Sequence, residues 1–123
     1  MSVETVNKPS LSFPRQWIFK KPDSFRSLYR NGRRLRGEII TIFFRPAGDD
    51  CFQVGFSTRK KLAHAVGRNR ARRLMRETVR IHQHEIRKDI QCLFLWHGPV
   101  KGIGFSAAEG EIMKLLQRGG LLK

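Results

Sequence analysis

The chain has 123 residues, of which 40% are hydrophobic, so it is long enough for one domain with a buried core and is not disordered as a whole. Its 25 lysines and arginines stand against 10 aspartates and glutamates, a formal net charge of +15. Such an excess repels itself in a folded protein and indicates a polyanionic partner, with nucleic acid favoured over an anionic membrane.

Targeting and redox signals are few. No stretch approaches the roughly 20 apolar residues that would span a bilayer, and Met1 to Ser10 contain no apolar signal-peptide core. Cys51 and Cys92 form neither a CxxC pair nor a disulfide framework. We therefore expect a cytoplasmic protein with two free thiols in a reducing compartment.

The N-terminal part divides into an arm and the first helix. Residues 1–21 are polar and punctuated by proline, which predicts an extended arm, and residues 22–123 are expected to form the domain. Pro22-Asp23 opens a short helix, because proline suits the first helical position and an early carboxylate favours the positive end of the dipole. Asn31-Gly32 ends this helix, with glycine in a left-handed position.

Two strands follow. Residues 38–45 (EIITIFFR) are rich in β-branched and aromatic side chains, and residues 52–58 (FQVGFST) alternate. In the second strand one face carries Phe52, Val54 and Phe56, while the other carries the small or polar Gln53, Gly55 and Ser57. The second face suits a floor on which a ligand lies. An ordinary solvated sheet face is the alternative, and it is favoured where no motif supports the ligand.

The C-terminal half predicts a helix, a strand and a helix. The long helix is expected to run from about Leu62 or Val66 to Arg87, and residues 90–96 form a buried strand. Residues 106–109 (SAAE) match a capping box with Ser106 as N-cap, and Gly119-Gly120 ends the last helix. The order helix, strands, helix, strand, helix indicates a single small α+β domain with helices packed on one mixed β-sheet.

The strongest chemical signal lies between residues 59 and 80 (RKKLAHAVGRNRARRLMRETVR). This segment holds nine lysines and arginines against one carboxylate, Glu77. At 100° per residue the basic positions share one face, with Arg70 at its border. The opposite face is expected to hold Ala63, Ala71, Leu74, Thr78 and Ile81. The residues of the basic face are Arg68, Asn69, Arg72, Arg73, Arg76 and Arg80.

A merely solvated basic face is the plain alternative, and it fits poorly. Arginines one and two turns apart repel one another, and soluble surfaces usually intersperse both signs. Arginine forks match pairs of phosphate oxygens, and a ladder of them at about 6 Å per turn can track a sugar-phosphate backbone. The helix is therefore predicted to bind nucleic acid.

This segment resembles a known family. Arg68-Asn69-Arg70, followed by Arg72-Arg73 and Arg76-Glu77, is similar to the signature of the bacterial ribonuclease P protein. The family precedes that signature with a Gly-hydrophobic-Ser/Thr-Val-Ser-Lys-Lys stretch, where residues 55–61 (GFSTRKK) stand here. The family's first-helix pattern is matched by Ser24-Phe25, Tyr29 and Gly32, and the resemblance runs roughly from Phe13 to Leu116.

The resemblance implies the protein subunit of an RNA-based endoribonuclease. A catalytic RNA would remove the 5′ leader of precursor tRNA, and the protein would assist while being inactive alone. The implied fold is similar to the second domain of ribosomal protein S5. The implied partners are the catalytic RNA and precursor tRNA, with no DNA and no membrane. Mg²⁺ is expected in the holoenzyme, with no cofactor, metal site or catalytic residue in the protein.

The resemblance also assigns two surfaces. The arginine-motif helix would face the catalytic RNA, and a cleft between the first helix and the sheet would bind the single-stranded leader. Unpaired bases stack on aromatic rings and a basic groove holds their backbone, which agrees with this assignment. The residues for the catalytic RNA are Arg68, Asn69, Arg70, Arg72, Arg73, Arg76 and Arg80. The residues of the cleft are Phe25, Tyr29, Ser57, Arg59, Lys60 and Lys61, with core packing as the alternative for Phe25 and Tyr29.

The sequence departs from the family at three places. Tyr29 replaces the commoner Phe and can still stack, and Thr58-Arg59 replaces Val-Ser, which adds charge near the cleft. Trp96-His97-Gly98 stands where the family commonly places Arg or Lys, so one basic contact to substrate is in doubt. The histidines are isolated, or two apart as His82 and His84 are, which predicts no metal site.

Three other classes compete with this interpretation. A ribosomal-type RNA-binding module shares the charge and size but leaves Phe25, Tyr29 and the arginine motif unexplained together. A DNA-binding helix protein would place a second helix beside the basic one, whereas strands flank it here. A membrane-surface helix needs large apolar residues opposite its charge, whereas Ala63, Gly67 and Ala71 are small.

Overall fold

A computed structural model describes residues 13–19, 22–49, 51–59, 61 and 64–123, and for residues 22–25 it describes the backbone alone. Four strands form one mixed sheet in the order β1-β2-β4-β3. They are β1 (Arg33–Arg36), β2 (Ile40–Pro46), β3 (Gln53–Thr58) and β4 (Ile90–Trp96). β2 pairs antiparallel with both β1 and β4, whereas β3 runs parallel to β4. The α+β prediction is therefore confirmed.

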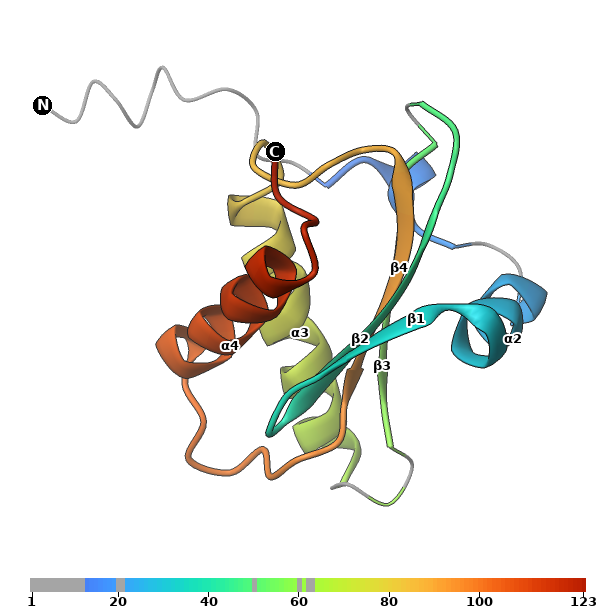
Figure 1. The fold of residues 1–123 in the computed structure, drawn as a ribbon. Coiled ribbons are helices and arrows are strands. Elements are labelled where there is room, and N and C mark those ends of the chain that lie inside the picture. The colour runs from blue at the N-terminus through green and yellow to red at the C-terminus, as the bar shows by residue number, and fades with distance from the viewer. Residues whose placement is uncertain (1–12, 20–21, 50, 60, 62–63) are drawn as a thin grey trace, which may run out of the picture.

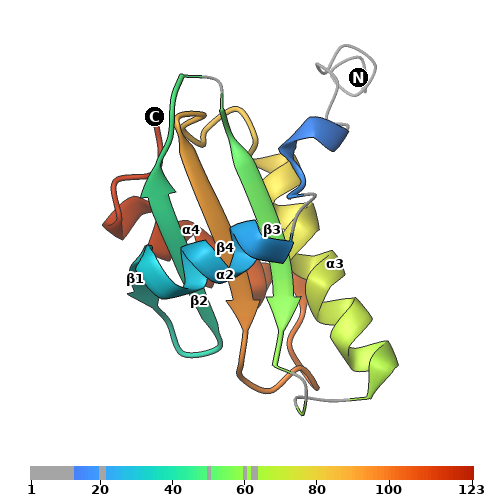
Figure 2. The same ribbon diagram turned by 90° about the vertical axis from the view of Figure 1, so that its right-hand side faces the viewer.

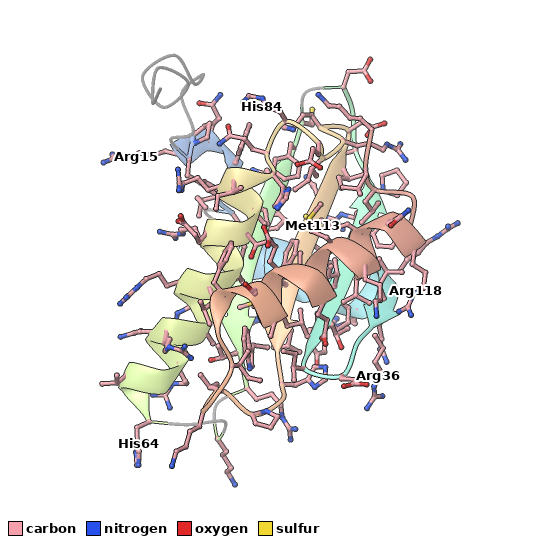
Figure 3. All side chains as sticks on the ribbon, turned by 90° about the vertical axis from the view of Figure 1, so that its left-hand side faces the viewer. Arg15, Arg36, His64, His84, Met113 and Arg118 are labelled. Carbon is pink, nitrogen blue, oxygen red and sulfur yellow. The ribbon has the colours of Figure 1, made fainter. Side chains whose placement is uncertain are left out.

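Three helices and a short turn complete the described chain. They are α2 (Pro22–Asn31), α3 (Ala65–Ile81), α4 (Phe105–Arg118) and the 3₁₀ turn η1 (Arg15–Trp17). Because β3 and β4 are parallel, the chain must cross over between them, and α3 is that crossover. α3 and α4 lie side by side on one face of the sheet (Figures 1 and 3), and α2 crosses the opposite face (Figure 2).

The main core lies between the sheet and the α3/α4 layer. Alternation along β2 and β4 turns one set of apolar side chains toward these helices and the other set toward α2. Ile42, Phe94 and Trp96 belong to the first set and are almost completely buried with Met75 and Ile112. The second set forms a smaller cluster of Phe19, Leu28, Phe43 and Leu93, on which α2 rests. The part of this second face that α2 leaves uncovered is available to a ligand.

The segment before α2 packs against the edge of the sheet. Ile18 forms a parallel bridge with Val54 of β3, and the Phe19 N–H donates to the Val54 carbonyl at 3.4 Å. The same segment contacts Lys88, whose ammonium nitrogen lies 5.4 Å from the ring centroid of Trp17. Burial lowers the pKa of Lys88, and its ammonium donates to the carbonyl oxygens of Gln83 and Ile86. Residues 1–12 and 20–21 of the predicted arm lie outside the described residues.

The prediction that Gly32 adopts a left-handed conformation was wrong. α2 ends at Asn31 as expected, but Gly32 has no positive φ; the glycines that do are Gly102 and Gly120. Glycine is needed at position 32 for close approach, because a Cβ there would lie 2.6 Å from the Leu28 carbonyl oxygen. α4 ends at Arg118, directly before Gly119-Gly120 as predicted, and Gly120 has a left-handed φ of 72°.

α3 ends at Ile81, six residues before the predicted end at Arg87. The chain must turn there to reach β4, and Ile86 is buried in an antiparallel bridge with Leu122. His82 fixes the turn: its ring nitrogens lie 2.5 Å from a Glu85 oxygen and 2.7 Å from a Glu109 oxygen on α4. Although burial disfavours the charged ring, these hydrogen bonds raise the pKa of His82 above its usual value.

Two further predictions are corrected. The N-cap of α4 is Gly104 rather than Ser106, so the N-cap residue has no side chain with which to cap the helix. Ser106 lies inside the first turn, and the Glu109 carboxylate contacts His82 instead of closing a capping box. On α3 the buried positions are Ala71, Met75, Thr78 and Val79, whereas Ile81 is 37% exposed. The buried face of α3 therefore differs from the predicted one, because it includes Met75 and Val79 and leaves Ile81 at the surface. Ala63 lies outside the described residues. Both cysteines are free thiols, as predicted.

Candidate nucleic-acid interface

The basic face of α3 is one of two arginine-rich surfaces. All of its predicted members are exposed or half-buried. Asn69, Arg72, Arg73 and Arg76 line a groove together with Ile18, Gly55 and Phe56, so the helix face and the edge of β3 form one surface. The Asn69 side-chain oxygen accepts a hydrogen bond from Arg72 at 2.5 Å. This amide fixes the direction of one arginine fork on the exposed side of the helix.

Aromatic rings position a second arginine of this face. The guanidinium carbon of Arg76 lies 5.9 Å from the ring centroids of both Phe13 and Phe56. The two rings contact each other edge to face, with centroids 5.9 Å apart. Because a guanidinium over an aromatic face keeps its in-plane N–H groups free, this contact orients Arg76 without consuming its donors.

Other members of the predicted set have partners within the protein. Arg80 forms two hydrogen bonds with Glu77, of 3.0 and 2.5 Å, and these lower the pKa of that carboxyl. Arg70 turns aside and donates to the Val100 carbonyl at 3.3 Å. The only carboxylate on the segment is therefore used by Arg80, at the end of the helix. The structure brings Asn69, Arg72, Arg73 and Arg76 together and leaves Arg70 and Arg80 at the margins.

The second surface lies on the other face of the sheet, beside α2. A cavity of about 390 Å³ is lined by Arg26, Tyr29 and Arg30 of α2, Phe56 and Ser57 of β3, and Leu93 of β4. Tyr29 is 52% exposed. One face of its ring stacks on Phe43 with centroids 4.7 Å apart and an angle of 27° between the planes. Tyr29 is thus a supported platform with a free face, flanked by two arginines.

A second cavity, of about 240 Å³, lies on the other side of Tyr29. Its lining includes Arg34 and Arg36 of β1, Thr41 of β2, Arg59 after β3 and His97 after β4. Ser57 of the first cavity and Leu95 of the second are direct neighbours across β3 and β4. The two cavities therefore form one groove over the uncovered sheet face, with Tyr29 between them.

The surroundings of His97 in this groove disfavour its charged form. Its Nε2 lies 2.9 Å from the Thr41 hydroxyl oxygen. Burial, followed by repulsion from Arg36, lowers the pKa of His97, and Glu111 opposes this only in part. The position where the resemblance led us to look for a cation is thus occupied by a side chain that resists protonation.

The structure places the predicted cleft residues in different surroundings. Tyr29 and Ser57 line the first cavity and Arg59 lines the second, so three of them meet in one groove. Lys61 is exposed in a turn and lines neither cavity. The Phe25 side chain and Lys60 lie outside the described residues. The roles assigned to these residues remain predictions.

Sequence reasoning missed β1 and its arginines. Residues 33–36 (RRLR) are too short and too charged to resemble a strand, and the expected strand began at Glu38. The signal that was present is alternation: arginines at 34 and 36 flank Leu35, which packs on Gly119, the C-cap residue of α4. A charged strand of this kind suits the edge of a sheet, where β1 lies.

Two absences concern the described residues only. They contain no group of three or more His, Cys, Asp or Glu side chains that could hold a metal ion. None of their helices has the length and apolar character needed to cross a membrane. The two surfaces are lined largely by arginines and aromatic rings, with hydroxyl and amide groups among them, and side chains of these kinds are the ones that proteins use for phosphates and unpaired bases. The fold and these surfaces define a small α+β RNA-binding protein.

The comparisons with known proteins place the chain within that class. The ribonuclease P family model matches residues 13–120. The ribonuclease P protein component of Dictyoglomus thermophilum is 31% identical over 114 residues, covering 91% of this chain and 95% of that protein. That of Chloroflexus aggregans is 34% identical over 104 residues, covering 84% and 77%. The chain belongs to the ribonuclease P protein family, whose function is the removal of the 5′ leader from precursor tRNA.

Solved structures agree on the fold. The Staphylococcus aureus RNase P protein superposes with a TM-score of 0.75 at 22% identity, covering 87% of this chain and 98% of that one. The Thermotoga maritima RNase P protein gives a TM-score of 0.70 at 23% identity, covering 76% and 89%. At these identities the structures establish the shared architecture alone.

Proposed function

We propose that the chain binds two RNAs at once: the catalytic RNA of ribonuclease P on the basic face of α3, and the single-stranded leader of precursor tRNA in the groove beside α2. The observation that carries this proposal is the division of the basic residues. One set lies on α3 and the edge of β3, and the other lies on α2, β1 and the opposite face of the sheet. Phe56 lines cavities of both sets, so the two surfaces meet along β3.

The chemistry of each surface fits its proposed ligand. Parallel arginine forks on a helix bind phosphates regardless of base, which suits a folded RNA whose bases are paired. A supported tyrosine beside arginines binds a base by stacking and a phosphate by charge, which suits an unpaired strand. The leader is a single-stranded extension of precursor tRNA, and the groove is therefore assigned to it.

We further propose that bond cleavage belongs to the RNA subunit. The protein then contributes substrate affinity and positioning, and it is inactive without that RNA. The Mg²⁺ ions of the reaction are proposed to be held by RNA phosphates, because the described part of the chain presents arginines and aromatic rings rather than carboxylates at both surfaces. The protein works where the RNA does, in the cytoplasm.

Paired variants test the division of labour. Arg72→Gln with Arg73→Gln should weaken binding of the catalytic RNA and flatten its salt dependence, by ~0.7–0.9 in the log–log slope for each lost phosphate contact. The control is Lys101→Gln with Lys114→Gln, which removes the same charge from exposed positions outside α3. Equal slopes for both double variants would show that the α3 face is merely solvated.

The reciprocal arm uses the groove. Tyr29→Ala should leave the affinity for the catalytic RNA within about twofold, since a side chain on the other face of the sheet makes no contact with it. The same change should weaken the binding of precursor tRNA by the assembled holoenzyme. Loss of catalytic-RNA binding in Tyr29→Ala, with the fold intact, would contradict the assignment of separate surfaces.

A further inference from the structure

The edge strand β1 places two arginines over the groove. Strand alternation turns neighbouring side chains to opposite faces, and Leu35 faces α4, where a Cβ on Gly119 would lie 2.5 Å from its methyl group. Arg34 and Arg36 therefore face the α2 side. Their Cα partners on β2 are Phe43 and Thr41. Phe43 is the residue on which Tyr29 stacks, so β1 and the aromatic platform are direct neighbours.

Three arginines from separate parts of the chain converge on the 240 Å³ cavity. Arg34 and Arg36 come from one edge of the sheet, and Arg59 comes from the end of β3 at the other edge. The lining includes Thr41 and His97 but no carboxylate. Among the described residues, none of the three arginines has an ion-pair partner. Glu111 acts on His97 from outside this lining, but its carboxylate accepts hydrogen bonds from the Ile39 and Ile40 N–H groups and opposes the effect of Arg36 only in part. The remaining excess of like charge is unfavourable unless an anion binds among the arginines.

One arginine of the cavity is held in a defined direction. The guanidinium carbon of Arg34 lies 5.5 Å from the ring centroid of Phe43. The same Phe43 ring stacks on Tyr29 at 4.7 Å. Arg34 and Tyr29 thus both contact the Phe43 ring, and this contact leaves the guanidinium N–H groups of Arg34 available to a ligand. A fork held in this way loses less side-chain entropy when it binds oxygen pairs.

We propose that this cavity is a phosphate subsite of the groove: Arg34, Arg36 and Arg59 bind a backbone phosphate of a single-stranded RNA next to the nucleotide whose base stacks on Tyr29. The inference deepens the proposed leader binding and rests on it. A phosphate is favoured over a carboxylate, because three forks from different directions match an anion with several oxygens on different sides. An RNA strand is favoured over an acidic peptide, because the cavity continues past an exposed aromatic platform into the 390 Å³ cavity.

The test couples an arginine to one phosphate. A series of precursor tRNAs is prepared, each with a single uncharged methylphosphonate linkage at one leader position. The affinity of the holoenzyme for each of them is measured with the wild-type protein and with Arg34→Gln. Each change alone should weaken binding by about 3- to 10-fold, the range of a partly exposed charge-assisted contact. At one linkage, or two adjacent ones, the methylphosphonate should weaken binding clearly less in Arg34→Gln than in the wild type, because only Arg36 and Arg59 then remain to bind that phosphate. Arg36→Gln should couple to the same linkage.

Arg33→Gln is the matched control. Arg33 is exposed on the same strand and carries the same charge, but alternation turns its side chain to the other face. It should couple to no linkage, and its loss should change leader binding less than twofold. Equal losses for Arg33→Gln and Arg34→Gln would mean that net charge alone acts, which overturns the subsite.

A second cycle separates this inference from the proposed function. An abasic nucleotide at each leader position is combined with Tyr29→Ala. If Tyr29 couples to one base while Arg34 and Arg36 couple to no linkage, the subsite is wrong and leader binding stands. If neither cycle shows coupling and both variants melt like the wild type, the groove does not bind the leader at all. Coupling of Arg34 and Arg36 to one leader linkage would also favour RNA over an acidic peptide as the ligand of this cavity.

Discussion

Removing the Tyr29 ring should reduce the affinity of the holoenzyme for precursor tRNA only when the leader is long enough to reach the groove. Stacking of a base on an aromatic side chain contributes about 1–3 kcal/mol by alanine substitution. One face of Tyr29 rests on Phe43, and Phe43, now 3% exposed, would be uncovered by the truncation and replace part of the platform. The loss should therefore lie at ~1–2 kcal/mol, which is about 5- to 30-fold in Kd.

The assay measures Kd of the assembled holoenzyme for precursor tRNAs with leaders of one nucleotide and of several nucleotides. Tyr29→Ala should weaken binding of the long leader and leave the short one nearly unchanged. Tyr29→Phe keeps the ring and should bind both within about twofold of the wild type. Because Tyr29 is half exposed, the fold should survive the substitution, and a melting curve verifies this. Equal losses for long and short leaders would refute the assignment of Tyr29 to the leader groove.

Three further predictions concern stability and reactivity. The pKa of His82 is raised in the folded state, so its two carboxylate contacts stabilise the fold fully below pH ~6.5 and less as the pH rises through the folded-state pKa. His82→Gln should therefore lower the melting temperature more at pH 5.5 than at pH 8.5. An equal effect at both pH values would contradict the charged bridge. Gly32→Ala should destabilise by ~1–3 kcal/mol in denaturant unfolding, because its Cβ meets the Leu28 carbonyl oxygen; a change below 0.5 kcal/mol would show that the turn relaxes freely. A thiol reagent should label exposed Cys51 in the native protein and buried Cys92, whose pKa burial raises, only on unfolding; fast labelling of both would contradict the buried position.

The sequence predicted the fold best where periodicity and punctuation agreed. Pro22 and Asn31-Gly32 bounded α2 correctly, and the apolar run of residues 90–96 matched β4 at both ends. α3 was predicted too long, because residues 82–87 remain compatible with a helix in their local pattern. Its end depends on contacts distant in sequence, between His82 and α4 and between Ile86 and the C-terminal segment.

The candidate site shows the same limit. The basic face of α3 follows from a 100° repeat and needs no tertiary information. The groove beside α2 does not, because it depends on strand order: β1 and β3 are opposite edges of the sheet, yet Arg34 and Arg59 line one cavity. A four-residue strand of mostly arginine carries no local strand signal, and only its pairing with β2 shows which of its arginines face the groove.

The most direct test of the account is reconstitution. The purified protein, a bacterial ribonuclease P RNA, and both together are incubated with precursor tRNA and Mg²⁺, and the products are mapped at the 5′ end. The account predicts no leader release by the protein alone, and cleavage at the mature 5′ end by the mixture at RNA concentrations where the RNA alone is slow. Cleavage by the protein alone, or a mixture no faster than the RNA alone, would contradict it.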